Sequence, residues 1–131
     1  MISVIFIVGL PASGKTTLAN KINDENGGIY KIVDDPKNFN LDIKPYLGGN
    51  MIITDPNLCR EDNRENAIKM ISSVDMNIKI DWIFFENNPK LCLVNALNRD
   101  GGKVKSSIFN LTRIYKIPQG ANIIPVFNSN N

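Results

Sequence analysis

Short apolar runs alternate with amphipathic segments along the whole chain. The runs at 2–8, 29–33, 51–54, 78–85 and 123–127 have the length and aliphatic composition of strands. Continuous apolar runs, rather than strict alternation, are typical of parallel strands that are covered on both faces. The pattern therefore predicts an α/β domain of three layers, with a mainly parallel five-stranded sheet between helices.

The segments between these runs carry the apolar spacing of helices. Helices are predicted over 15–25, 57–74 and 89–98, with a short one within 34–50 and a last one after a loop at 99–105. The positions predicted to face inward are Leu18, Ala19, Ile22, Leu58, Ile68, Ile71, Val74, Ile108, Leu111 and Tyr115. Pro125 places the last strand at the edge of the sheet, because proline cannot donate a ladder hydrogen bond. Residues 1–127 are expected to form one domain and 128–131 a flexible tail.

Composition narrows the chemistry. The chain has 131 residues and a net charge of +2, which permits an anionic ligand without requiring nucleic acid. It contains no histidine, so a general base must be a carboxylate, a lysine or a tyrosine. Cys59 and Cys92 form no metal-binding spacing and are expected to be reduced and buried. The N-terminal apolar run is too short to span a bilayer, so a cytoplasmic protein without a membrane partner is expected.

The clearest motif lies between the first strand and the first helix. Residues 9–17 read Gly-Leu-Pro-Ala-Ser-Gly-Lys-Thr-Thr and match GxxxxGK[ST], a phosphate-binding loop. The residues assigned to nucleotide binding are Gly9, Pro11, Ala12, Ser13, Gly14, Lys15, Thr16 and Thr17. The glycines permit the backbone to turn its N–H groups inward, and the helix start adds positive charge. Lys15 is expected to face solvent and reach the β- and γ-phosphates, and Thr16 to ligate Mg²⁺. A chance glycine-rich turn is the alternative.

Acidic residues follow two of the predicted strands. Asp55 ends the run at 51–54 and is assigned to the Mg²⁺ site together with Thr16, with the capping of a helix before Pro56 as the less favoured alternative. Asp34 and Asp35 follow the second strand, where a kinase needs a carboxylate to accept the proton of the attacking hydroxyl. Turn formation by Asp-Asp-Pro is the competing explanation for that pair.

A basic segment follows the third long helix. Five basic residues lie between 99 and 116 against one acidic residue, Asp100. The Gly101-Gly102 pair makes the loop mobile, so Arg99 is assigned to stabilising the transferring phosphoryl group and Lys103 to binding the triphosphate. For Arg113 and Lys116 an ordinary solvated face is the preferred interpretation.

These residues resemble a known family, the kinase domain of phage 5′-polynucleotide kinase. The family loop Gly-x-Pro-x-Ser-Gly-Lys-[Ser/Thr]-Thr fits residues 9–17, and Gly28-Ile29-Tyr30 fits the strand before the catalytic aspartate. Residues 52–58, Ile-Ile-Thr-Asp-Pro-Asn-Leu, are similar to the family block Ile-Ile-Ser-Asp-Thr-Asn-Leu. A looser match, residues 98–115, resembles the family lid and the helix after it.

The resemblance implies a P-loop kinase fold and the transfer of a phosphoryl group from ATP. The expected cofactors are ATP and Mg²⁺, and the expected acceptor is the 5′-hydroxyl of single-stranded DNA or RNA, in a host cytoplasm if a phage encodes the protein. Asp35 falls where the family has its general base, with Asp34 one position off, and Asp55 matches the aspartate of the second block. Arg99, alone or with Lys103 or Lys105, corresponds to the lid.

Two departures leave other acceptors open. The family has an arginine three residues past its catalytic aspartate, where it contacts the acceptor phosphate, and this chain has Asn38 there, beside Lys37. The acceptor-binding insert is also short, covering little more than 36–50. A second hypothesis is therefore a kinase for a nucleoside, a nucleotide, a modified DNA base or another small alcohol. A third is a module that binds or hydrolyses a nucleoside triphosphate without a hydroxyl acceptor.

Overall fold

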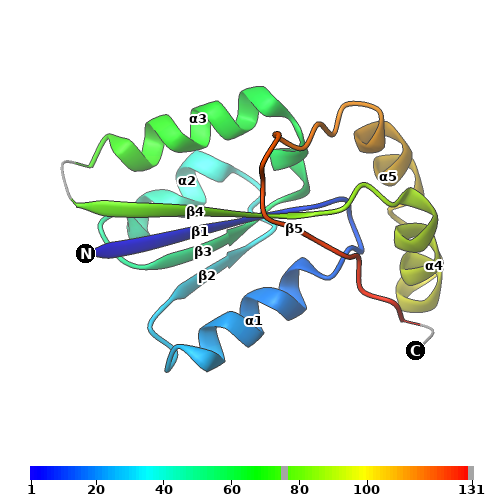
Figure 1. The fold of residues 1–131 in the computed structure, drawn as a ribbon, viewed down its shortest axis with the longest axis horizontal. Coiled ribbons are helices and arrows are strands. Elements are labelled where there is room, and N and C mark those ends of the chain that lie inside the picture. Colours follow the sequence, from blue (N-terminus) through cyan, green and yellow to red (C-terminus); the bar gives the residue numbers. More distant parts are fainter. Residues whose placement is uncertain (75–76, 130–131) are drawn as a thin grey trace.

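A parallel sheet lies at the centre of the protein. The computed structural model describes residues 1–74 and 77–129 (Figure 1). The strands within these ranges are β1 (Ile2–Val8), β2 (Lys31–Asp34), β3 (Met51–Thr54), β4 (Ile78–Phe85) and β5 (Ile123–Ile124). They lie in the order β2-β3-β1-β4-β5, and each neighbouring pair is parallel. The predicted α/β class is confirmed, and the described sheet is parallel throughout rather than mainly so.

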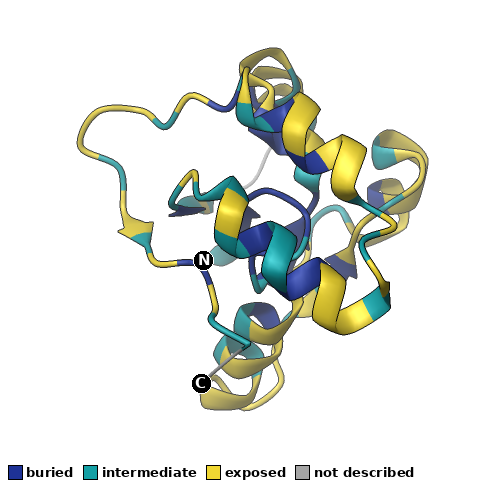
Figure 2. Ribbon diagram, turned by 90° about the vertical axis from the view of Figure 1, so that its right-hand side faces the viewer, coloured by how far each residue is buried: buried dark blue, intermediate teal, exposed yellow. Residues whose placement is uncertain are grey.

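Helices cover both faces of this sheet and lie beyond one end of it. The helices are α1 (Lys15–Glu25), α2 (Phe39–Ile43), α3 (Glu61–Ser72), α4 (Pro89–Asp100) and α5 (Lys105–Thr112), with 3₁₀ turns η1 (Lys44–Tyr46) and η2 (Pro56–Cys59). In Figure 1, α1 lies on one face, α2 and α3 lie on the other, and α4 and α5 lie past the strand ends. The helices turn buried residues inward and exposed residues outward (Figure 2). No described helix is long and apolar enough to cross a membrane.

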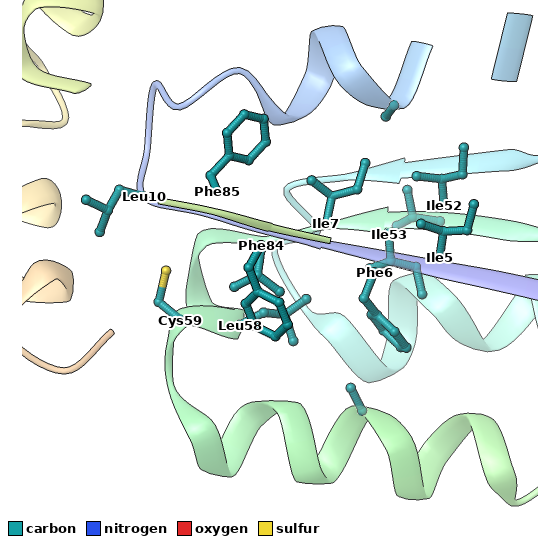
Figure 3. Close-up of a cluster of buried hydrophobic side chains, with 14 of the residues drawn as sticks. Ile5, Phe6, Ile7, Leu10, Ile52, Ile53, Leu58, Cys59, Phe84 and Phe85 are labelled. Atoms are coloured by element: carbon teal, nitrogen blue, oxygen red, sulfur yellow. The ribbon is translucent and has the colours of Figure 1, made fainter. Parts of the chain in front are cut away.

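The core lies on the two faces of β1 and β4. Ile7 and Phe85 point toward α1, whereas Phe6 and Phe84 point toward α3 (Figure 3). Phe6 is fully buried, and its ring stacks on Trp82 of β4 at 4.3 Å between centroids. Because β1 is paired with β3 on one edge and β4 on the other, its end is held firmly in place.

Some predicted boundaries are wrong, each for a local reason. The helix predicted over 57–74 is broken, because Arg60 is extended (φ −81°, ψ 128°) between η2 and α3. Ile68 was expected to face inward, but it lies on the outer side of α3 and is 40% exposed. The strand predicted from residue 29 begins at Lys31, and Ile29 is 57% exposed.

The C-terminal half shows two further differences. Helix α4 continues to Asp100 and ends at Gly101 (φ 76°), so Arg99 belongs to the last turn of a helix and not to a loop. Strand β5 has two residues instead of the five expected over 123–127. Its position at the sheet edge, expected from Pro125, is confirmed.

Both cysteines are buried and unpaired, as predicted. Cys59 lies in η2 and Cys92 in α4, and neither side chain is exposed. Burial raises the pKa of the Cys59 thiol to about 12 and that of the Cys92 thiol to about 11. These thiols are therefore packing groups and not nucleophiles in the folded protein.

We predict that Phe6→Ala lowers the free energy of unfolding by about 3–5 kcal/mol, because it removes a fully buried ring and its stacking contact with Trp82. Urea unfolding followed by far-ultraviolet circular dichroism measures the change. The matched control is Phe109→Ala in α5, where the ring is 40% exposed and truncation should cost about 1 kcal/mol or less. Equal losses for the two variants would contradict the assignment of the core.

Candidate active site

The sheet topology opens a crevice at the carboxyl ends of β1 and β3. From β1 the chain passes over β3 to reach β2, and from β3 it passes over β1 to reach β4. Because these connections leave in opposite directions, the loops after β1 and β3 separate at their shared edge, which is where open α/β sheets bind ligands. The loop at 9–17 follows β1, and Asp55 follows β3.

A cleft of about 720 Å³ lies against this loop. It brings together residues that the sequence analysis assigned separately, namely Pro11, Ala12, Gly14, Lys15, Thr16, Thr17, Asp35 and Arg99. Asn57, Asn95, Phe127 and Ser129 also line it, and none of these four was predicted. Its volume is within the range of small-ligand sites.

The loop has a shape that only glycine permits at two positions. Gly14 adopts φ 111° as the residue before α1, and a Cβ there would lie 2.9 Å from Cβ of Phe127. A Cβ on Gly9 would lie 2.5 Å from Oγ of Ser13. Ser13 Oγ is itself buried and has no hydrogen-bond partner in the described part of the chain. A tight backbone turn around an unpaired hydroxyl fits a loop that receives an oxygen-rich anion.

Lys15 does not face solvent, contrary to the prediction. Its residue is 6% exposed, and its Nζ donates a hydrogen bond of 2.9 Å to the carbonyl oxygen of Leu10. The side chain therefore folds back across the loop, where it shares the carbonyl oxygen of Leu10 with the N–H of Ser13. Burial lowers the pKa of Lys15, and the negative charge of Asp35 partly offsets this effect.

Asp34 and Asp35 have different surroundings, although they are adjacent. Asp34 accepts hydrogen bonds from Oγ1 of Thr16, at 2.9 and 3.0 Å to its two oxygens, and from Oγ1 of Thr54. Asp35 has a left-handed backbone (φ 46°) and donates its N–H to Thr54 O at 2.8 Å. Only Asp35 lines the cleft, and burial raises its pKa despite the opposing charge of Lys15. The contact between Asp34 and Thr16 was not expected from the sequence.

Asp55 caps η2 and does not line this cleft, although its charge interacts with that of Lys15. It is 4% exposed, and its Oδ1 accepts the N–H of Asn57 at 2.9 Å at the start of η2. Burial raises its pKa, and the Asn57 hydrogen bond opposes that shift. In the described residues, no group of three or more acidic, cysteine or histidine side chains forms a metal site. A hydroxyl with one or two carboxylates is nevertheless the usual protein share of a Mg²⁺ site, since water and phosphates supply the rest.

Of the two basic residues assigned to phosphate contacts, Arg99 reaches the cleft and Lys103 does not. Arg99 lines the cleft, and its guanidinium lies 3.2 Å from a carboxylate oxygen of Asp100. Lys103 is exposed and lies outside the cleft lining, so its predicted contact with a triphosphate has no support in this conformation. The turn explains its position, because the Asp100 carboxylate accepts the backbone N–H of Gly102 and of Lys103.

Asn95 joins three parts of the chain that no local pattern connects. Its Nδ2 donates to Ala12 O at 3.0 Å and to Phe127 O at 2.6 Å, and its Oδ1 accepts from Ser129 N at 3.1 Å. Phe127 N also donates to Ser13 O at 3.0 Å. The start of the predicted tail is thus hydrogen-bonded beside the loop, whereas 130–131 lie outside the described residues. The sequence gives no signal for this, since Asn95 and Ala12 are 83 residues apart.

Comparison with known proteins agrees with this fold. A gluconokinase from Sinorhizobium meliloti 1021 has a TM-score of 0.63 at 15% identity, covering 95% of this chain and 82% of that one. A fungal RNA kinase has a TM-score of 0.67 at 13% identity, covering 98% and 75%. A chain from the PezAT toxin-antitoxin system of Streptococcus pneumoniae has a TM-score of 0.59 at 13% identity, covering 85% and 60%. These likenesses show the fold.

The fold and the loop define a class, the P-loop NTPase domains with the fold of P-loop kinases. No family model matches the chain. It belongs to the family of the uncharacterized protein R277 of Acanthamoeba polyphaga mimivirus, with 34% identity over 104 residues that cover 76% of this chain and 75% of that protein.

We predict that Gly14→Ala weakens the binding of a non-hydrolysable ATP analogue by about tenfold or more, because a methyl group would collide with Phe127 and displace the loop. Isothermal titration calorimetry measures the affinity. Gly28→Ala is the matched control, because Gly28 also has positive φ (73°) but has nothing within 4 Å of an added Cβ. It should cost about 1 kcal/mol of stability and leave the affinity unchanged. If both variants bind equally well, the loop does not depend on this contact.

Proposed function

We propose that this protein is a Mg²⁺-dependent kinase that transfers the γ-phosphoryl group of ATP to a hydroxyl group. The observation that carries the proposal is one shared cleft, which a phosphate-binding loop lines together with a carboxylate, Asp35, and a cation, Arg99. A protein that only bound nucleotide would need the loop but not a carboxylate placed to accept a proton. The kinase fold supports the same conclusion.

The donor side is assigned to the loop. Its backbone N–H groups and the start of α1 would bind the phosphates, with the Ser13 hydroxyl as a further partner. Lys15 would exchange its hydrogen bond with Leu10 O for one with a β- or γ-phosphate oxygen. This exchange favours binding, because it gives a buried ammonium group an anionic partner.

Mg²⁺ would be held by Thr16 with a carboxylate from Asp55 or Asp34. The Asp34 contact with the Thr16 hydroxyl and the position of Asp55 after β3 support this donor set. All of these donors are oxygen atoms, which is the ligand type that Mg²⁺ prefers. When bound with the triphosphate, the ion neutralises phosphate charge.

The acceptor side is assigned to Asp35. Its carboxylate would accept the proton of the attacking hydroxyl while that oxygen bonds to the γ-phosphorus and the bond to the β-phosphate oxygen breaks, releasing ADP. Partial loss of water around Asp35 raises its pKa, which makes it a better base than a fully solvated aspartate. Arg99 would leave Asp100 and stabilise the charge on the transferring group.

For the acceptor we propose the 5′-hydroxyl of a nucleoside unit, at the end of single-stranded DNA or RNA or in a free nucleoside. The resemblance of residues 9–17 and 52–58 to polynucleotide kinases supports this class, and the likeness to a fungal RNA kinase agrees with it. The mimivirus relative supports a host cytoplasm as the place of action. The test is transfer from γ-labelled ATP to a 5′-hydroxyl oligonucleotide and, in parallel, to a nucleoside mixture. Release of free phosphate alone would sink the proposal and favour an NTPase module.

We predict that Lys15→Met abolishes phosphoryl transfer, with a loss of about 100-fold or more, because it removes the ammonium group that binds the phosphates. Methionine preserves the buried volume, so unfolding by urea should stay cooperative. Lys21→Met, on the exposed side of the same helix, is the control and should retain full activity. Full activity in Lys15→Met would remove the loop from the mechanism.

We predict that Asp35→Asn lowers kcat by about 100-fold or more while changing ATP affinity little, because only the base is lost. In the unaltered protein, kcat should fall as pH drops through the raised pKa of Asp35, since the protonated carboxyl cannot accept a proton. That acidic limb should disappear in Asp35→Asn. If Asp34→Asn gives this result and Asp35→Asn does not, the base is Asp34.

A further inference from the structure

A second cavity, of about 600 Å³, adjoins the phosphate cleft. It lies between the segment that leads from β2 into α2 and the segment formed by η2 and α3. Asn57 lines both cavities, and Pro36, which lines the second, directly follows Asp35, which lines the first. A molecule in the second cavity would therefore be next to the carboxylate proposed as the base.

Neutral amides dominate the wall of this cavity. Five of its lining residues are asparagines, Asn38, Asn40, Asn57, Asn63 and Asn66, so we call it the asparagine pocket. Each amide both donates and accepts hydrogen bonds, as do sugar hydroxyls and the edges of nucleobases. Phe39, Leu58 and Met70 add apolar surface, against which the face of a ring can lie.

Part of this hydrogen-bonding capacity is already fixed in place. Asn38 Oδ1 accepts from Leu41 N at 3.2 Å, and Asn63 Nδ2 donates to Asn57 O at 2.8 Å. These bonds orient the two amides and leave the Nδ2 of Asn38 and the Oδ1 of Asn63 for a ligand. Asn40 and Asn66 make no side-chain hydrogen bond within the described residues. The wall of the pocket therefore has two amides held in fixed orientations and two that can rotate to suit a ligand.

The charges in the pocket do not favour an anion. Lys37 is its one basic lining residue in the described chain, and it is opposed by the buried carboxylate of Asp55. The first turn of α3, which enters the same wall, begins with the acidic residues Glu61 and Asp62. Proteins commonly bind phosphates with arginine or with several cations, and the described lining of this pocket has neither. The start of α2 lies in its wall, but the Asn38 side chain already accepts the N–H of Leu41 there. A phosphate placed here would lose water and meet a like charge.

We propose that the asparagine pocket is the acceptor site and that it selects an uncharged, hydroxyl-bearing sugar ring, free or in a nucleoside, over an acceptor that carries its own phosphate. This inference rests on the proposed kinase function, because it names the substrate class of the same site. It narrows that function toward a free nucleoside or sugar and away from a polynucleotide end, in which a phosphate follows the first sugar.

The test compares acceptors that share a 5′-hydroxyl. With γ-labelled ATP and Mg²⁺, kcat/KM is measured for nucleosides, for free ribose, for nucleoside 3′-monophosphates and for a 5′-hydroxyl oligonucleotide. The kcat/KM for a nucleoside or for ribose should exceed that for the nucleoside 3′-monophosphate by about tenfold or more. Whichever of the nucleoside and ribose has the higher kcat/KM shows whether the preferred sugar ring is free or part of a nucleoside. Faster transfer to the 3′-monophosphate or the oligonucleotide would overturn the inference while leaving the kinase function in place.

A substitution that adds a positive charge to the asparagine pocket tests the same selectivity by changing the protein. Asn66→Arg should raise kcat/KM for the 3′-monophosphate and lower it for the nucleoside, so that their ratio changes by about tenfold. Asn20→Arg, the same substitution on the exposed side of α1 and away from both cavities, should leave that ratio unchanged. An unchanged ratio in Asn66→Arg would also contradict the inference.

Binding measurements distinguish a failure of this inference from a failure of the proposed kinase function. Calorimetry with the Lys15→Met variant, which is not expected to transfer phosphate, measures nucleoside, ribose and 3′-monophosphate affinities directly. Binding of a neutral acceptor that Asn66→Ala weakens would support the pocket even if no transfer were found in the unaltered protein, and the kinase function alone would then fail. The absence of any neutral-acceptor binding would sink the inference itself.

Discussion

The burial of strand β1 is the constraint on which the rest of the site depends. This strand is paired along both edges and covered on both faces, so the loop that follows it starts from a fixed point. Helix α1 fixes the other end of the loop, and the hydrogen bonds from Asn95 and Phe127 hold its outer side. A loop held in this way can present its N–H groups to an anion with little reorganisation, which is the condition for strong electrostatic stabilisation.

The same enclosure sets the charge balance of the cleft. Lys15 and Asp55 are buried and Asp35 is more exposed, yet loss of contact with water is the largest influence on the pKa of each. Desolvation lowers the pKa of the lysine and raises those of the acids, because it disfavours the charged form of each group. An anionic ligand with its metal ion would supply the missing partners. Ligand binding and the ionisation of the site are therefore coupled.

Sequence reasoning succeeded where the structure follows from local pattern. The loop at 9–17 and the strand before Asp55 each lie within a few residues, and the fold class followed from the alternation of short apolar runs with amphipathic segments. It failed where the position of a side chain depends on contacts with distant parts of the chain. The burial of Lys15 depends on its hydrogen bond back to the carbonyl of Leu10, and the contacts of Asn95 are to segments 32 and 83 residues away. The different surroundings of Asp34 and Asp35 follow from a left-handed backbone at Asp35, which no propensity would place there.

The two buried cysteines give the molecule a pair of native reporters. Cys59 lies just after Asp55 on one wall of the site, and Cys92 lies in α4, the helix that carries Asn95 and Arg99 on the other. Because both thiols are enclosed and remain protonated near neutral pH, an alkylating reagent can modify them only when their surroundings open. The labelling rate at each cysteine therefore measures the local opening of each wall separately, in a chain that needs no engineered probe.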